Sequence, residues 1–172
     1  MSSPPTERGK IEKLYRQHGA ALLLFAAAMV GDRSRAQDAV HQVFLKMLES
    51  GTLSRALDAK AYLFASVRNA LLNDEKIRQR NVSLESLPQD DATWFIPRDH
   101  DYAEETMLRR ALADLPDDQR EVIVLHIWGE LTFAQIAEVL EISSNTAASR
   151  YRYALAKMRE AVCAREGFCA NH

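Results

Sequence analysis

The stretch Leu131–Leu155, LTFAQIAEVLEISSNTAASRYRYAL, carries the most informative pattern in the sequence. Its apolar spacing predicts two helices, about Thr132–Leu140 and Ser144–Ala164, joined by a turn at Glu141–Ser143. Two helices with so short a connection are typical of a helix-turn-helix, whose second helix enters the major groove of DNA. The alternative is an ordinary helical hairpin with a solvated basic face.

Local signals support both helix starts in this stretch. Thr132 and Gln135 form a capping box, which satisfies two amides at the start of the first helix. Ser143 is a suitable cap for the second helix. Glu141 stands where such turns often use glycine to reach a positive φ, and a residue with a side chain costs about 1 kcal/mol in that conformation.

The second helix presents polar and basic side chains at the spacing of one face. Arg and Asn have the geometry for paired hydrogen bonds to base edges, while Arg150, Lys157 and Arg159 suit phosphates, which position the helix without specifying sequence. The side chains predicted to contact DNA are Ser144, Asn145, Thr146, Ala148, Ser149, Arg150, Arg152 and Tyr153.

Upstream of this stretch the sequence predicts a second pair of helices. One begins near Tyr102, and Leu115-Pro116 ends it, because proline fits the first turn of a following helix. Asp117 and Asp118 then lie where the helix dipole favours negative charge. This helix should end near Trp128.

Residues 81–105 differ from the rest of the chain in composition. They hold two prolines and seven Asp and Glu residues, with Arg98 as the one Lys or Arg, which predicts an extended acidic linker. Trp94, Phe95 and Ile96 inside it are either a patch docked on a neighbouring domain or an undocked part of the linker.

The N-terminal half predicts three helices. The first spans about Glu7–Val30 and stops at Gly31, and the second opens at Ser34, which forms a capping box with Gln37. A loop at Gly51–Asp58 precedes a long third helix at about Ala59–Arg80. The prediction is therefore an all-α fold of two small helical domains, 7–80 and 106–164, with the linker 81–105 between them and a short tail, 165–172.

Composition limits the classes of function. The chain has 172 residues, 47% hydrophobic and 27% charged, as in soluble globular proteins. Its net charge of −2 argues against a protein that simply coats nucleic acid, so DNA contact must come from local basic patches. The longest apolar run, Ala20–Val30, is too short to span a membrane, and the polar start lacks a signal-peptide core. We expect a cytoplasmic protein without membrane insertion.

Three segments together resemble the extracytoplasmic-function (ECF) subgroup of bacterial sigma factors. They are RAQDAVHQVFL at Arg35–Leu45, AYLFASVRN at Ala61–Asn69 and ALADLPDDQREVI at Ala111–Ile123, the last running on into the helix-turn-helix. The resemblance covers nearly the whole chain. It implies that Leu14–Arg80 is similar to the second conserved sigma region and Met107–Val162 to the fourth, and that the protein directs core RNA polymerase to promoters.

The resemblance implies a polymerase-binding surface on the second helix. Asp38, Gln42, Val43 and Phe44 would then face the clamp helices of the core enzyme. An amphipathic helix packed internally is the alternative for its apolar positions.

The third helix is similar to the strand-opening helix of the family. Holding unstacked bases suits aromatic and polar side chains, and the loop Gly51–Asp58 is either a flipped-base pocket or an ordinary surface loop. Core packing is the alternative for Tyr62 and Phe64. The residues that the resemblance assigns to promoter melting are Tyr62, Arg68, Asn69, Asn73, Lys76, Arg78 and Arg80.

The resemblance also implies partners. The C-terminal domain would bind the upstream promoter element as duplex DNA and contact a flap of the polymerase, and an anti-sigma factor is an expected regulator. The competing hypotheses are a stand-alone helix-turn-helix regulator, which should bind duplex tightly without polymerase, and an adaptor that packs helices on a partner.

No residue set predicts catalysis or a bound cofactor. The sequence lacks a glycine-rich phosphate loop, an HExxH pair and a serine elbow. Cys163, Cys169 and His172 do not have the spacing of a zinc finger, so we expect a frayed tail and no metal; a redox or metal input is the alternative.

Overall fold

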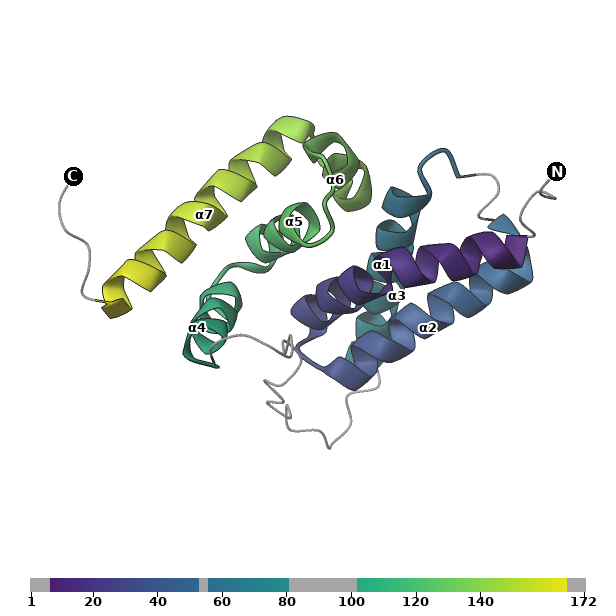
Figure 1. The fold of residues 1–172 in the computed structure, drawn as a ribbon, viewed down its shortest axis with the longest axis horizontal. Helices are drawn as coiled ribbons and strands as arrows, with labels where there is room; N and C mark the ends of the chain where they lie inside the picture. The colour runs from purple at the N-terminus through teal and green to yellow at the C-terminus, as the bar shows by residue number, and fades with distance from the viewer. Residues whose placement is uncertain (1–6, 53–55, 81–101, 167–172) are drawn as a thin grey trace.

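A computed structural model describes residues 7–52, 56–80 and 102–166. In these ranges the chain is helical, with no strand, as the sequence predicts. Figure 1 shows an N-terminal group of three helices beside a C-terminal group of four. The helices are α1 (Glu7–Val30), α2 (Arg33–Ser50), α3 (Ala59–Arg80), α4 (Tyr102–Ala113), α5 (Asp117–Ile127), α6 (Phe133–Leu140) and α7 (Ser144–Glu166).

Helices α1 and α2 form a hairpin with a very short connection. Gly31 has φ +68°, the left-handed conformation that ends α1, as predicted. The cap of α2 differs from the prediction: Asp32, not Ser34, is the N-cap, and its Oδ1 accepts from the Arg35 amide at 3.1 Å. Ser34 lies inside the helix because Asp32, directly after the turn, already has the extended conformation that an N-cap requires.

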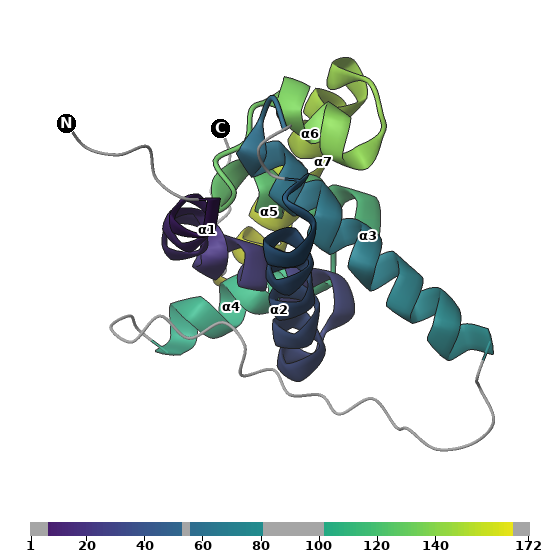
Figure 2. The ribbon, with the colours of Figure 1, turned by 90° about the vertical axis from the view of Figure 1, so that its right-hand side faces the viewer.

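Helix α3 lies against both members of this hairpin (Figure 2). It begins where Asp58 Oδ1 accepts from the Ala61 amide at 3.0 Å, a side-chain cap that the sequence analysis did not identify. Near its far end, Arg35 of α2 makes ion pairs with Asp74 at 2.8 Å and Glu75 at 3.1 Å. Both acids are half exposed, so these ion pairs contribute little to stability.

The turn between α4 and α5 is stabilised by one arginine. Arg120 donates to the carbonyl oxygens of Leu112, Ala113 and Leu115 at 2.8, 2.9 and 2.7 Å. The last carbonyls of a helix have no partner inside the helix, so this side chain serves as a C-cap for α4. Pro116 then opens α5, as the Leu-Pro pair predicts.

The middle of helix α5 is buried on every side. Val122, Ile123, Val124 and Leu125 are each at most 1% exposed. Four consecutive residues of an α-helix point in four directions, so such a run has no solvent face. On one side α5 packs against α6 and α7, and on the other it packs against α1.

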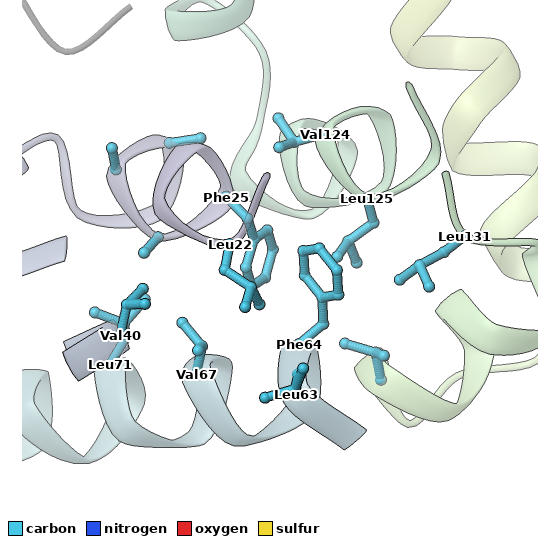
Figure 3. Packing of buried hydrophobic residues seen from close by; sticks show 14 of the residues in the cluster. Leu22, Phe25, Val40, Leu63, Phe64, Val67, Leu71, Val124, Leu125 and Leu131 are labelled. Carbon is cyan, nitrogen blue, oxygen red and sulfur yellow. The ribbon is translucent and has the colours of Figure 1, made fainter. Parts of the chain in front are cut away.

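One apolar core therefore runs through both groups of helices. Figure 3 shows Phe25 and Phe64 from the N-terminal group meeting Leu125 and Leu131 from the C-terminal group. The two phenylalanine rings pack edge to face with centroids 5.7 Å apart. None of the described helices is both long and apolar enough to cross a membrane.

Candidate nucleic-acid interface

The turn between α6 and α7 has the geometry that the sequence predicts. Glu141 takes the left-handed conformation, φ +57° and ψ +44°, without being glycine. Ser143 Oγ accepts from the Thr146 amide at 3.0 Å and so caps α7. At the start of α6, both hydrogen bonds of the capping box between Thr132 and Gln135 are present.

Helix α7 has one side in the core and one side in solvent. Ala147 and Ala154 are fully buried, and small side chains there allow α7 to approach α5 and α6 closely. Tyr151 packs its ring against His126 and Phe133, with centroids 4.6 and 5.5 Å away. The opposite side of α7 is consequently free to enter a groove.

The predicted DNA-contacting residues divide between these two sides. Ser144, Asn145, Arg152 and Tyr153 are exposed, with Tyr153 at 66%. Thr146, Ala148 and Ser149 are half-buried at the edge of the same face. Arg150 points elsewhere, because its Nε lies 3.2 Å from Asp118 of α5.

Helix α3 carries a second polar face. Five of its predicted residues are exposed and recur at spacings of seven, four, three and four, so they lie along one side of the helix. We call this face the α3 stripe, and it consists of Tyr62, Asn69, Asn73, Lys76 and Arg80. An aromatic ring, two amides and two cations in a row can stack on bases and hold phosphates.

Two predicted members lie off the α3 stripe. Arg78 is exposed but is two residues from both Lys76 and Arg80, which turns it to another side of the helix. Arg68 points at α5, where its Nε lies 3.4 Å from Glu121 Oε2. Phe64 is fully buried, so core packing is its role, whereas Tyr62 is 38% exposed.

The pair formed by Arg68 and Glu121 is largely removed from water, with side chains 20% and 15% exposed. Burial raises the pKa of Glu121 above its usual value, although Arg68 acts in the opposite direction. Desolvation of the carboxylate therefore outweighs its attraction to the guanidinium. The pair fixes the contact between α3 and α5 more than it stabilises the fold.

Helix α2 presents a mixed surface on its outer side. Asp38 and Gln42 are exposed, but Val43 and Phe44 are buried at 7% and 6% and belong to the core. The ring of Phe44 packs edge to face on Tyr15, with centroids 5.0 Å apart.

Two leucines complete the exposed side of α2, and the sequence analysis missed them. Leu45 is 59% exposed and Leu48 is 47% exposed, next to Gln42 and His41. Helical spacing could have predicted this position, because Leu45 follows Asp38 by seven residues and Gln42 by three, which puts the three side chains on one side of the helix.

Comparison with known proteins finds a family match for each half of the chain. A family model described as Sigma-70 region 2 matches residues 14–81, and one described as Sigma-70, region 4 matches residues 105–158. Together they cover most of the chain in the order that the resemblance implied. The chain belongs to the sigma-70 family.

Its similarity to individual sigma factors extends over almost the full length. It is 29% identical over 157 residues to the ECF RNA polymerase sigma factor SigL of Mycobacterium tuberculosis, covering 89% of each chain. It is 28% identical over 167 residues to the RNA polymerase sigma-E factor of Streptomyces coelicolor, covering 91% of this chain and 88% of that one. These relatives support assignment to the ECF subgroup.

A solved structure has the same fold. It is the sigma factor RpoE from Bartonella quintana, crystallised with the anti-sigma factor NepR. The TM-score is 0.71 at 22% identity, over 89% of this chain and 96% of that one. We call α1–α3 region 2 and α4–α7 region 4 of this sigma factor, after the two matches, which cover most of these helices.

The described residues contain no cluster of three His, Cys, Asp or Glu side chains able to hold a metal ion. Cys163 is half-buried in α7. Cys169, His172 and the aromatic patch at Trp94–Ile96 lie outside the described residues, and so does most of the linker.

Proposed function

We propose that this protein is an ECF-type sigma factor that binds core RNA polymerase and directs promoter recognition and transcription initiation. The observation that carries the proposal is the presence of two separate nucleic-acid faces in one chain. The exposed side of α7 suits the major groove of a duplex, and the α3 stripe suits bases that have left the stack. Recognition followed by strand opening needs both.

Region 4 is assigned to the duplex. Arg152 and Asn145 are exposed on the first turns of α7, the part of a recognition helix that reaches base edges. Lys157, one turn further on, is exposed and suits a phosphate. Arg150 is paired with Asp118, so we assign it to the fold of region 4 and not to a phosphate contact.

Region 2 is assigned to the polymerase and to the open strand. The polymerase-binding surface that we propose is the exposed side of α2: Asp38 and Gln42 as polar contacts, with Leu45 and Leu48 as apolar ones. Val43 and Phe44 would act indirectly, by holding α2 against α1. The α3 stripe would hold the displaced bases, and no catalytic step is assigned to any residue.

The protein would work in the cytoplasm with polymerase and promoter DNA. An anti-sigma factor is a further proposed partner, because the structural relative RpoE was crystallised with one. A stand-alone helix-turn-helix regulator would use α7 but leave both the α3 stripe and the exposed leucines of α2 without a role.

Co-elution with sigma-free core polymerase on size exclusion tests the proposal. Leu45→Ala and Asp38→Ala should each weaken co-elution, since both side chains are exposed on α2. The matched control is Ile77→Ala, which truncates a side chain of similar exposure, 56%, on α3. Failure of the unaltered protein to co-elute, combined with tight duplex binding by the free protein, would replace the sigma factor with the stand-alone regulator.

A further inference from the structure

The first turns of α7, which carry Asn145 and Arg152, pack on α5 and α6, while the C-terminal half of the helix lies toward α4 (Figure 1). Ala147 and Ala154 are the fully buried residues of this contact. Alanine forms only a shallow ridge on a helix, so these two side chains hold α7 close without fixing its rotation about its own axis. Larger side chains beside the two alanines must fix that rotation.

Tyr151 is the first of these larger side chains. Its ring meets the ring of His126 edge to face, with centroids 4.6 Å apart, near the C-terminal end of α5. The orientation of His126 is itself fixed, because Nδ1 donates to the carbonyl oxygen of Leu131 at 2.8 Å and the ring stacks on Phe133. Tyr151 therefore rests on a rigid support.

Arg150 is the second, and it anchors the opposite flank. Its Nε lies 3.2 Å from Oδ2 of Asp118, in the first turn of α5. Successive residues of an α-helix are about 100° apart, so Arg150 and Tyr151 lie about 50° to either side of the line through the two buried alanines. Their partners, Asp118 and His126, are separated by about 12 Å along α5. Two contacts placed in this way resist rotation of α7 in both directions.

Reading bases requires a well-defined rotation of the recognition helix. A rotation of about 20° moves a side-chain tip about 5–6 Å from the helix axis by about 2 Å. Hydrogen bonds to base edges tolerate only a few tenths of an ångström. Asn145 and Arg152 can therefore reach their base edges together at only one rotation of α7.

We propose that Asp118 is a positioning residue for base reading: its ion pair with Arg150, opposite the contact of Tyr151 with His126, sets the rotation of the recognition helix. This inference rests on the proposed function, since it takes α7 to read a duplex. It gives a role to an ion pair whose side chains, 30% and 48% exposed, are too solvated to contribute much to stability. Asp118 acts through α7 and need not contact DNA.

Asp118→Asn tests the positioning role, and Asp117→Asn is the matched control. Both substitutions remove one negative charge from the first turn of α5, but Asp117 pairs with Arg120 of its own helix and not with α7. The holoenzyme first selects a motif from a library of random-sequence duplexes. Fluorescence anisotropy then compares its affinity for that motif with its affinity for the same duplex scrambled in the upstream element.

The ratio of these two affinities should fall about tenfold in Asp118→Asn, the discrimination that one paired base contact provides. Affinity for the scrambled duplex should not fall, and the thermal midpoint of unfolding should fall by no more than about 3 °C. Asp118→Glu should restore the ratio because it keeps the carboxylate. Arg150→Gln removes the other member of the pair and should lower the ratio in the same way, which keeps the test valid if Asp118→Asn misfolds.

Equal ratios in Asp118→Asn and Asp117→Asn would overturn the positioning role. An equal loss of affinity for both duplexes, with a larger drop in the thermal midpoint, would also overturn it, because the ion pair would then only stabilise region 4. Co-elution of the unaltered protein with core polymerase is measured first, and its failure would bear on the proposed function alone. The free protein would then replace the holoenzyme in the same selection, with the same outcomes for Asp118.

Discussion

Replacing Phe64 by alanine should destabilise region 4 as much as region 2, although Phe64 belongs to region 2. Its ring is fully buried, packs on Phe25 and touches Gly129 across the interface. Removing a buried phenylalanine side chain costs about 3–5 kcal/mol. With a urea dependence of about 2 kcal/mol per molar, the midpoint of unfolding should fall by about 2 M.

The assay uses a reporter confined to region 4. The chain has two tryptophans, so a Trp94→Phe background leaves Trp128, beside the end of α5, as the fluorescent probe. Its urea midpoint should coincide with that of far-ultraviolet circular dichroism and move with it in Phe64→Ala. Asn69→Ala, an exposed change in the same helix, should move neither by more than about 0.5 kcal/mol. A Trp128 midpoint that stays in place while the circular dichroism curve shifts would refute the continuous core.

Three further predictions follow from single side chains. Glu141→Gly should stabilise the protein by about 0.5 kcal/mol in thermal melts, because the relief of left-handed strain exceeds the entropy that glycine loses on folding. The control Glu138→Gly, at an exposed position inside α6, should destabilise it by about 1 kcal/mol. Burial raises the pKa of Glu121, so its contribution to stability is complete below the unfolded pKa of about 4.3 and is lost as pH rises through the folded pKa. Glu121→Gln should remove that loss, so the variant should gain stability relative to the unaltered protein as pH rises from 4 to 7. A difference in stability that does not grow over this range would contradict the argument. Arg152→Ala should lower affinity for a promoter by about 1–3 kcal/mol and relax specificity at one base, while Lys157→Ala should weaken all sequences equally and reduce the salt dependence, both measured by fluorescence anisotropy.

Local patterns predicted the elements of this fold well. The three N-terminal helices, the Leu-Pro break before α5 and the helix-turn-helix all lie where apolar spacing and capping residues place them. These features depend on residues a few positions apart, which is the range over which sequence determines backbone geometry. The sequence identified Glu141 as the position where such turns often use glycine, and the structure shows that Glu141 itself takes the left-handed conformation there.

Which side of a helix faces solvent was harder to predict. The functional assignment of Val43 and Phe44 came from the resemblance, which places a whole segment at an interface without separating its two sides. Phe44 is buried because Tyr15 of α1 lies against it. The resemblance assigned Arg68 to promoter melting, but a partner more than fifty residues away, Glu121, determines its direction. Tertiary contacts of this kind cannot be read from helical spacing.

The sequence contains one indication that region 4 packs on region 2, which the prediction did not use. Four consecutive apolar residues from Val122 to Leu125 exceed what one face of a helix can bury, so α5 needed a second partner besides α6 and α7. The sequence predicted two domains joined by a linker, and this apolar run was not used to ask whether they pack together. In the structure α1 is that second partner.

The burial of α5 on both sides also sets the free-energy cost of separating region 4 from region 2. Releasing region 4 from α1 and α3 exposes one side of a helix that carries Val124 and Leu125, together with Leu131. Each fully buried side chain of this kind contributes about 1.5–3 kcal/mol when removed from water, so the separated form is costly without a surface that covers it. Loss of the single hydrogen bond between Asp58 and Gln135 therefore does not separate the two regions. A partner that covers these side chains would favour separated regions, in proportion to its preference for that form.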